Sequence, residues 1–132
     1  MLYKFSITTD ANTPVTSKKK TVLKLARGII HQLDVQFPSG PSGLLHVHIN
    51  DAIHQIFPYN TDENFASSNV NIRFREFIPL FEEPYQLEAY TWNEDDTYEH
   101  LVIIRIGILP AKVIAPWVLS FEERLESIFG GD

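Results

Sequence analysis

Two histidines one residue apart, His46 and His48, are the residues of this sequence best placed to do chemistry. Alternate residues of a β-strand point to the same face, so His46-Val47-His48 would present two imidazoles side by side, a spacing that metal sites use. A third imidazole ligand would have to come from elsewhere in the chain, where the remaining histidines are His31, His54 and His100. One interpretation is a metal-dependent enzyme. The other is a polar strand face whose histidines are half exposed or bonded to cross-strand neighbours.

The same stretch resembles the opening of the cupin metal motif, because Gly40 is followed by five residues and then by His-x-His. A cupin has a Glu four or five residues after the second His, followed by a Gly. This chain has Asn50-Asp51-Ala52-Ile53 there, and the second cupin motif, Pro-x-Gly with a later His, is absent. A cupin-like enzyme using His46 and His48 is therefore kept only as an alternative.

An acidic stretch, Asn93-Glu94-Asp95-Asp96, offers the oxygen ligands that calcium prefers. Its spacing is not that of an EF-hand loop, and a solvated turn between two strands is the simpler interpretation. The aromatic residues nearby allow a further alternative, a carbohydrate-binding module with Tyr90, Trp92 or Tyr98 as a sugar platform.

Catalytic motifs give no further support to an enzyme. The sequence has no Gly-x-Ser-x-Gly elbow, phosphate loop or dinucleotide fingerprint. It has no Cys, which excludes thiol nucleophiles, disulfides and zinc-cysteine sites. We therefore predict a protein that is not an enzyme, with no catalytic residues, no cofactor and no metal.

Charge is distributed unevenly along the chain. The formal net charge of −6 disfavours nucleic acid as a partner. Residues 1–27 nevertheless carry six bases against one acid, so the remaining residues hold 17 − 1 = 16 acids and 11 − 6 = 5 bases. Such polarity suits docking onto an acidic surface, including that of a sister copy. The candidate interface residues are Lys18, Lys19 and Lys20 in the basic region, and Arg73 and Arg75 on one face of a later strand. Solvated charges are the alternative.

The elements that must position these residues are β-strands. A chain of 132 residues is one domain by size, and about eight short strands alternate with turn residues. Eight strands with long connections at 8–20 and 58–68 predict an antiparallel β-sandwich of jelly-roll type. The predicted core is Leu33, Val35, Phe37, Val47, Ile49, Ile72, Phe74, Leu87, Ala89, Val102, Ile104 and Ile106.

The stretch from Pro84 to Pro110 organises this sandwich. Two apolar runs flank the acidic turn, which predicts a long β-hairpin. In the second run both faces are largely apolar, so this strand should lie deep in a sheet and not at a wet edge.

The two ends of the chain depart from the strand pattern. Residues 1–20 are predicted to be a short first strand followed by a polar arm, and residues 111–132 a linker followed by a short amphipathic helix. Trp117 and Phe121 give this C-terminal segment apolar area, which packs either on its own domain or on another subunit. No signal peptide or run long enough to span a membrane is found, so we expect a protein made in the cytoplasm.

The whole pattern resembles the small all-β structural proteins in virions of tailed bacteriophages, such as capsid decoration (cement) proteins and neck or tail accessory proteins. The likeness covers residues 20–110 and is one of architecture, since no family motif is matched. It implies a non-enzymatic protein that forms homo-oligomers and binds a capsid or neck, is located in the virion, and binds neither nucleic acid nor membrane.

Overall fold

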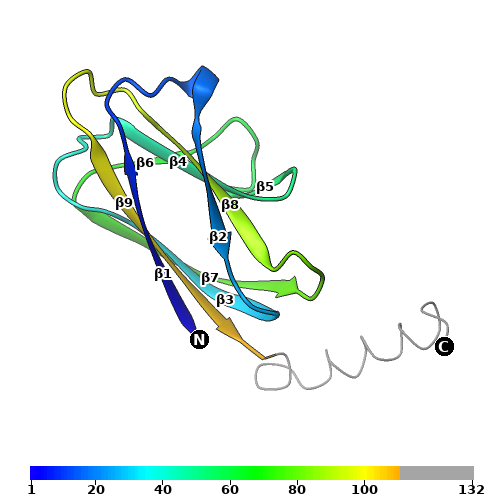
Figure 1. Cartoon of the computed structure of the whole chain (residues 1–132). Helices are drawn as coiled ribbons and strands as arrows, with labels where there is room; N and C mark the ends of the chain where they lie inside the picture. Colours follow the sequence, from blue (N-terminus) through cyan, green and yellow to red (C-terminus); the bar gives the residue numbers. More distant parts are fainter. Residues whose placement is uncertain (111–132) are drawn as a thin grey trace, which may run out of the picture.

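Nine β-strands form two antiparallel sheets in residues 1–110, the part of the chain that this computed structural model describes (Figure 1). Sheet A has the strand order β1-β9-β3-β7, and sheet B has the order β2-β8-β4-β5, with β6 also pairing with β4. The strands of sheet A are β1 (Leu2–Thr9), β9 (His100–Leu109), β3 (Gly28–Phe37) and β7 (Val70–Leu80). Those of sheet B are β2 (Lys19–Lys24), β8 (Gln86–Asn93), β4 (Leu45–Asp51), β5 (His54–Phe57) and β6 (Phe65–Ala66).

The strand order is that of the predicted jelly roll, because the chain crosses repeatedly from one sheet to the other. The predicted hairpin between 84 and 110 is wrong. Its two strands, β8 and β9, lie in opposite sheets, so the acidic turn carries the chain across the sandwich. Each strand instead pairs with two others, β8 with β2 and β4, and β9 with β1 and β3. The prediction that the second run lies inside a sheet is confirmed.

Strand alternation builds the core between the two sheets. Of the predicted core residues, ten are fully buried, namely Leu33, Val35, Phe37, Val47, Ile49, Leu87, Ala89, Val102, Ile104 and Ile106. Ile72 and Phe74 pack against this core but are only partly buried, because they lie on the edge strand β7. The alternation therefore sends the side chains of His46 and His48 to the outer face of sheet B.

A β-bulge at His31 changes the faces of β3. The sequence alternation places Ile29 and His31 with Leu33 on the core face, but pairing with both neighbouring strands shifts between Ile30 and Gln32. The extra residue lets Ile30 join the core cluster while His31 is only half buried.

The predicted polar arm is not free. Residues 8 and 9 belong to β1, residues 19 and 20 belong to β2, and a short 3-10 helix η1 (Val15–Ser17) lies between them. Backbone hydrogen bonds of 3.1 and 3.0 Å join Thr13 and Asn93 in both directions, and Asn12 N donates to the Asp95 carbonyl at 2.8 Å. Residues 1–20 are therefore part of the sandwich, since β1 pairs with β9 in sheet A.

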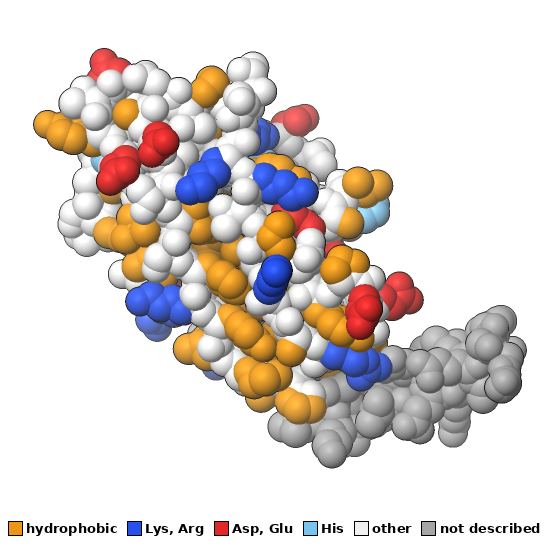
Figure 2. Space-filling model, viewed as in Figure 1, with side chains coloured by type: hydrophobic (Ala, Val, Ile, Leu, Met, Phe, Trp, Pro, Cys, Tyr) orange, Lys and Arg blue, Asp and Glu red, His pale blue; other side chains and the backbone are white. Residues whose placement is uncertain are grey.

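The β1–β2 side of the sandwich exposes apolar side chains. Tyr3, Phe5 and Leu25 pack on the core but stay partly exposed, and Leu2 and Val22 are exposed. Figure 2 shows hydrophobic side chains along this side with Lys and Arg side chains among them.

The predicted C-terminal linker and helix, with Trp117 and Phe121, lie outside the described residues. No helix in residues 1–110 is long and apolar enough to cross a membrane.

Candidate functional site

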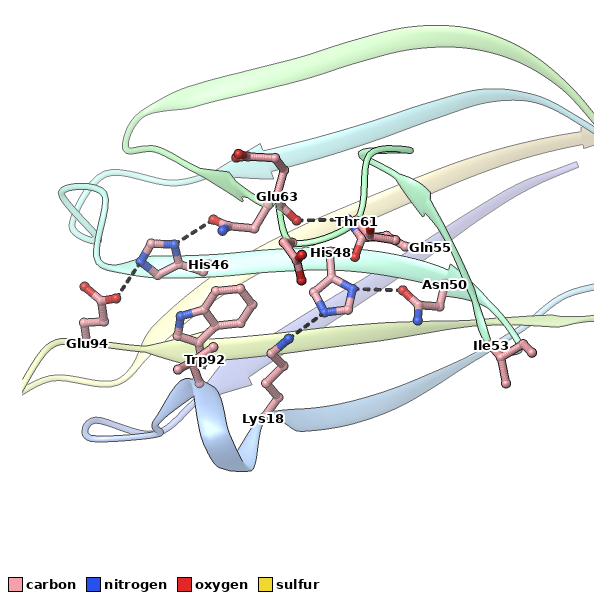
Figure 3. Close-up of a pocket in the computed structure, with 13 residues that line it drawn as sticks. Lys18, His46, His48, Asn50, Ile53, Gln55, Thr61, Glu63, Trp92 and Glu94 are labelled. Atoms are coloured by element: carbon pink, nitrogen blue, oxygen red, sulfur yellow. Dashed lines mark hydrogen bonds and ion pairs between the residues drawn. The ribbon is translucent and has the colours of Figure 1, made fainter.

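A pocket of about 500 Å³ opens on the outer face of sheet B (Figure 3). Its floor is formed by His46 and His48 on β4 and by Trp92 on β8. One wall is the segment around η1, with Val15 and Lys18, and the other is the 53–64 region, whose contributing residues are Ile53, Gln55, Thr61, Asp62, Glu63 and Asn64. The jelly roll thus places two loops on either side of two central strands.

The floor is a row of stacked side chains. His46 and Trp92 are cross-strand partners, and their rings are parallel with centroids 4.9 Å apart. Lys18, which precedes β2, places its Nζ 4.8 Å from the centre of the Trp92 ring. Since β8 lies between β2 and β4, the indole is held between a cation and an imidazole, and Trp92 is only 6% exposed.

His46 fixes one wall of the pocket. Its Nδ1 lies 2.7 Å from Asn64 Oδ1 and donates to it, which ties the 58–64 loop to the sheet. Gln55 Nε2 holds the same loop by donating to the carbonyls of Pro58, Asn60 and Glu63 at 2.8, 3.2 and 2.9 Å. This wall is therefore formed before any ligand arrives.

His48 fixes the opposite wall. Lys18 Nζ lies 3.1 Å from His48 Nε2, and an ammonium can only donate, so Nε2 carries a lone pair. The ring proton is then on Nδ1, which donates to Asn50 Oδ1 at 2.9 Å. Burial lowers the pKa of His48 below its usual 6.5; the hydrogen bond to Asn50 acts against this, and the Lys18 charge lowers the pKa further.

This arrangement predicts a loss of stability in mild acid. Because the unfolded chain protonates His48 at a higher pH than the folded state does, the stabilisation is fully present above pH 6.5 and is lost as the pH falls below 6.5 through the lower folded pKa. Urea unfolding of the wild type and of His48→Gln across this range measures the effect. The difference in unfolding free energy between the two proteins should shrink as the pH falls. A difference that does not vary with pH would contradict this assignment.

The two histidines do not combine into the metal site considered from the sequence. Each ring is engaged with a different wall, and the Lys18 ammonium lies where a cation bound to His48 Nε2 would sit. Residues 1–110 contain no group of three His, Asp or Glu arranged to hold a metal ion. Trp92 likewise offers no sugar platform, because it is buried and stacked against His46.

The acidic stretch at 93–96 is a hydrogen-bonded turn. Asp95 Oδ1 accepts from the backbone N–H groups of Thr97 and Tyr98 at 2.9 and 3.3 Å, and its Oδ2 lies 2.7 Å from His100 Nε2. The Thr97 N–H, followed by His100, lowers the pKa of Asp95 below its usual 3.8. These partners engage both carboxylate oxygens of Asp95 within the turn.

A second charged surface lies on the outer face of sheet A. Cross-strand register places Lys4, Arg105, Asp34 and Arg73 in one row, and Arg75 beside Gln32 in the next. The Asp34 carboxylate is buried beneath this row, 3.6 Å from Arg73 Nε, and it accepts from Gln32 Nε2 at 3.3 Å. We call the surface formed by Lys4, Arg73, Arg75 and Arg105 the basic face.

The structure divides the candidate interface residues between two surfaces. Arg73 and Arg75 lie on the basic face. Lys18 lies in the pocket of the other sheet, while Lys19 and Lys20 are exposed on edge strand β2. Sequence reasoning missed Lys4 and Arg105, which join the basic face through strand pairing that no local pattern specifies.

No protein-family model matches this chain, and no curated protein matches it. Among solved structures, the chain is similar to one described as "Crystal Structure of FeII HppE", with 8% sequence identity and a TM-score of 0.43. The match covers 80% of this chain but only 43% of the other, so the chain spans less than half the length of that protein. A likeness at this score supports no statement about activity.

Proposed function

We propose that this protein is a non-enzymatic structural protein that binds other copies of itself and a larger protein assembly. The assembly that we propose is a virion, in which the protein would act as a capsid decoration or accessory protein. The jelly roll supports this only as an architecture, because one fold serves many functions.

The observation that carries the proposal is the basic face. The chain has a net charge of −6, yet two neighbouring rows of sheet A bring together four basic side chains around a single acid. Arg73 is 70% exposed, and Arg75 makes no ion pair with any residue in 1–110. Like charges gathered on a flat sheet face repel one another, so an acidic protein surface placed against them is favoured.

Reversing charge on the basic face should weaken assembly without unfolding the domain. The suitable variant is Lys4→Glu with Arg75→Glu, because both side chains project outward; Arg73 is kept since it pairs with the buried Asp34. Sedimentation velocity should show the wild type associating and the variant shifted toward monomer. Thermal melting should change little.

The matched control reverses two exposed lysines of edge strand β2, Lys20→Glu with Lys24→Glu. It makes the same change in net charge on the other sheet and should associate like the wild type. Equal association of all three proteins would contradict the basic face as the docking surface. The virion setting is tested separately, by asking whether the wild type co-purifies with a large particle that electron microscopy can image.

A further inference from the structure

We propose that the pocket of sheet B receives Arg75 from the basic face of a second copy, so that copies join head to tail. This inference rests on the proposed function. It specifies that the partner is a second copy of the chain and that the two contacting surfaces are the basic face and the pocket of sheet B. Sheets A and B are the two layers of the sandwich, so their outer faces point in opposite directions (Figure 1). An interface between two different surfaces is heterologous, and it builds rings or filaments instead of closed pairs.

Charge makes the pocket complementary to the basic face. Three acidic residues line it, Asp62, Glu63 and Glu94, against one basic residue, Lys18. The Lys18 ammonium is already engaged with His48 and Trp92, which leaves the carboxylates to a visiting cation. The side chain of Glu94 is 57% exposed and thus open to a partner.

His46 lies beside Glu94 at the edge of the pocket. With Nδ1 of His46 donating to Asn64 Oδ1, Nε2 of the same ring lies 3.3 Å from Glu94 Oε1. Nε2 is buried and has no hydrogen bond of acceptable geometry. Because Nε2 is buried, a group from a second copy can reach only the exposed carboxylate of Glu94.

A guanidinium fits these requirements better than an ammonium. It offers five N–H donors in a planar fork, which can pair with an exposed carboxylate in a bidentate way. Val15 and Ile53 border the pocket and are exposed, so they can contact the aliphatic part of an arginine side chain. Arg75 is exposed on an edge strand, which lets it reach a second copy.

The test is a charge exchange between two variants. The basic-face variant is Lys4→Glu with Arg75→Glu, and the pocket variant is Glu63→Lys with Glu94→Lys. Each variant alone opposes like charges across the proposed interface and should self-associate about tenfold or more weakly than the wild type. An equimolar mixture should associate again, because each variant then meets opposite charge. Sedimentation velocity at matched total concentration reports all three.

The control for the pocket variant is Glu82→Lys with Glu83→Lys, which makes the same charge change on exposed residues outside the pocket and should leave self-association unchanged. Melting curves should show every variant folded. If the pocket variant associates like the wild type while the basic-face variant does not, the basic face binds some other surface, and the head-to-tail inference is overturned while the proposed function stands. If the mixture stays dissociated, the inference is also overturned. A wild type that is monomeric at all concentrations overturns self-association itself.

Discussion

Replacing Ile104 by Ala is expected to lower the unfolding free energy by about 2 to 5 kcal/mol. Ile104 is fully buried at the centre of sheet A, where its cross-strand partners are Phe5 on β1 and Val35 on β3. Truncation removes apolar contacts with both neighbours and leaves a cavity that two hydrogen-bonded strands cannot collapse. Equilibrium unfolding in urea measures the loss as a lower midpoint.

Ile103→Ala is the matched control, because it makes the same truncation one residue earlier. Ile103 lies on the outer face of sheet A and is only half buried, so the loss should be roughly 1 kcal/mol or less. Equal losses of unfolding free energy for the two variants would contradict the assignment of Ile104 to the core face of β9 and of Ile103 to its outer face.

Replacing Asn93 by Asp is expected to be about as damaging, with a loss of roughly 3 to 5 kcal/mol. Asn93 is 1% exposed, and its Nδ2 donates to the carbonyls of Thr9 and Tyr98 at 3.2 and 2.9 Å. Its Oδ1 accepts from Asp95 N at 3.0 Å. An Asp keeps the shape of this side chain but turns the donor into a charged oxygen that faces two carbonyls in a buried site. Thermal and urea unfolding at neutral pH would measure the loss.

Asn71→Asp serves as its control. Asn71 lies on edge strand β7. With its amide oriented so that the oxygen faces Arg73, this oxygen accepts from Arg73 Nε and Nη2 at 3.0 and 3.1 Å, so a carboxylate there meets a cation. Stability should stay within about 0.5 kcal/mol of the wild type. If Asn93→Asp is tolerated equally well, Asn93 does not hold the junction between β1, β8 and the acidic turn.

The architecture of this domain could be read from local sequence, and its strand pairing could not. Alternation identified the jelly roll and most of the core because burial of one strand face is a property of the strand itself. The predicted hairpin at 84–110 is wrong because two apolar runs around a short turn can form two strands that pair with each other or two strands that lie in opposite sheets. The bulge at His31 also escaped prediction, since it appears only in the register with both neighbouring strands.

The candidate site was predictable only in part, because alternation shows which residues share a strand face but not which segments lie beside them. The spacing of His46 and His48 correctly placed two imidazoles on one strand face, and this face is the pocket floor. Their roles depend on partners brought by other segments, Lys18 before β2 and Asn64 in the 58–64 loop. Arg73 and Arg75 were recognisable as a pair, but Lys4 and Arg105 join them only through strand order.

The most direct measurement of the central claim is sedimentation velocity of the wild type over a concentration series at low and at high ionic strength. Association through oppositely charged faces should grow with concentration at low salt and weaken markedly at high salt, because exposed charges are screened. A chain that remains monomeric in both buffers, or that associates equally well in both, would contradict charge-driven self-assembly through the basic face.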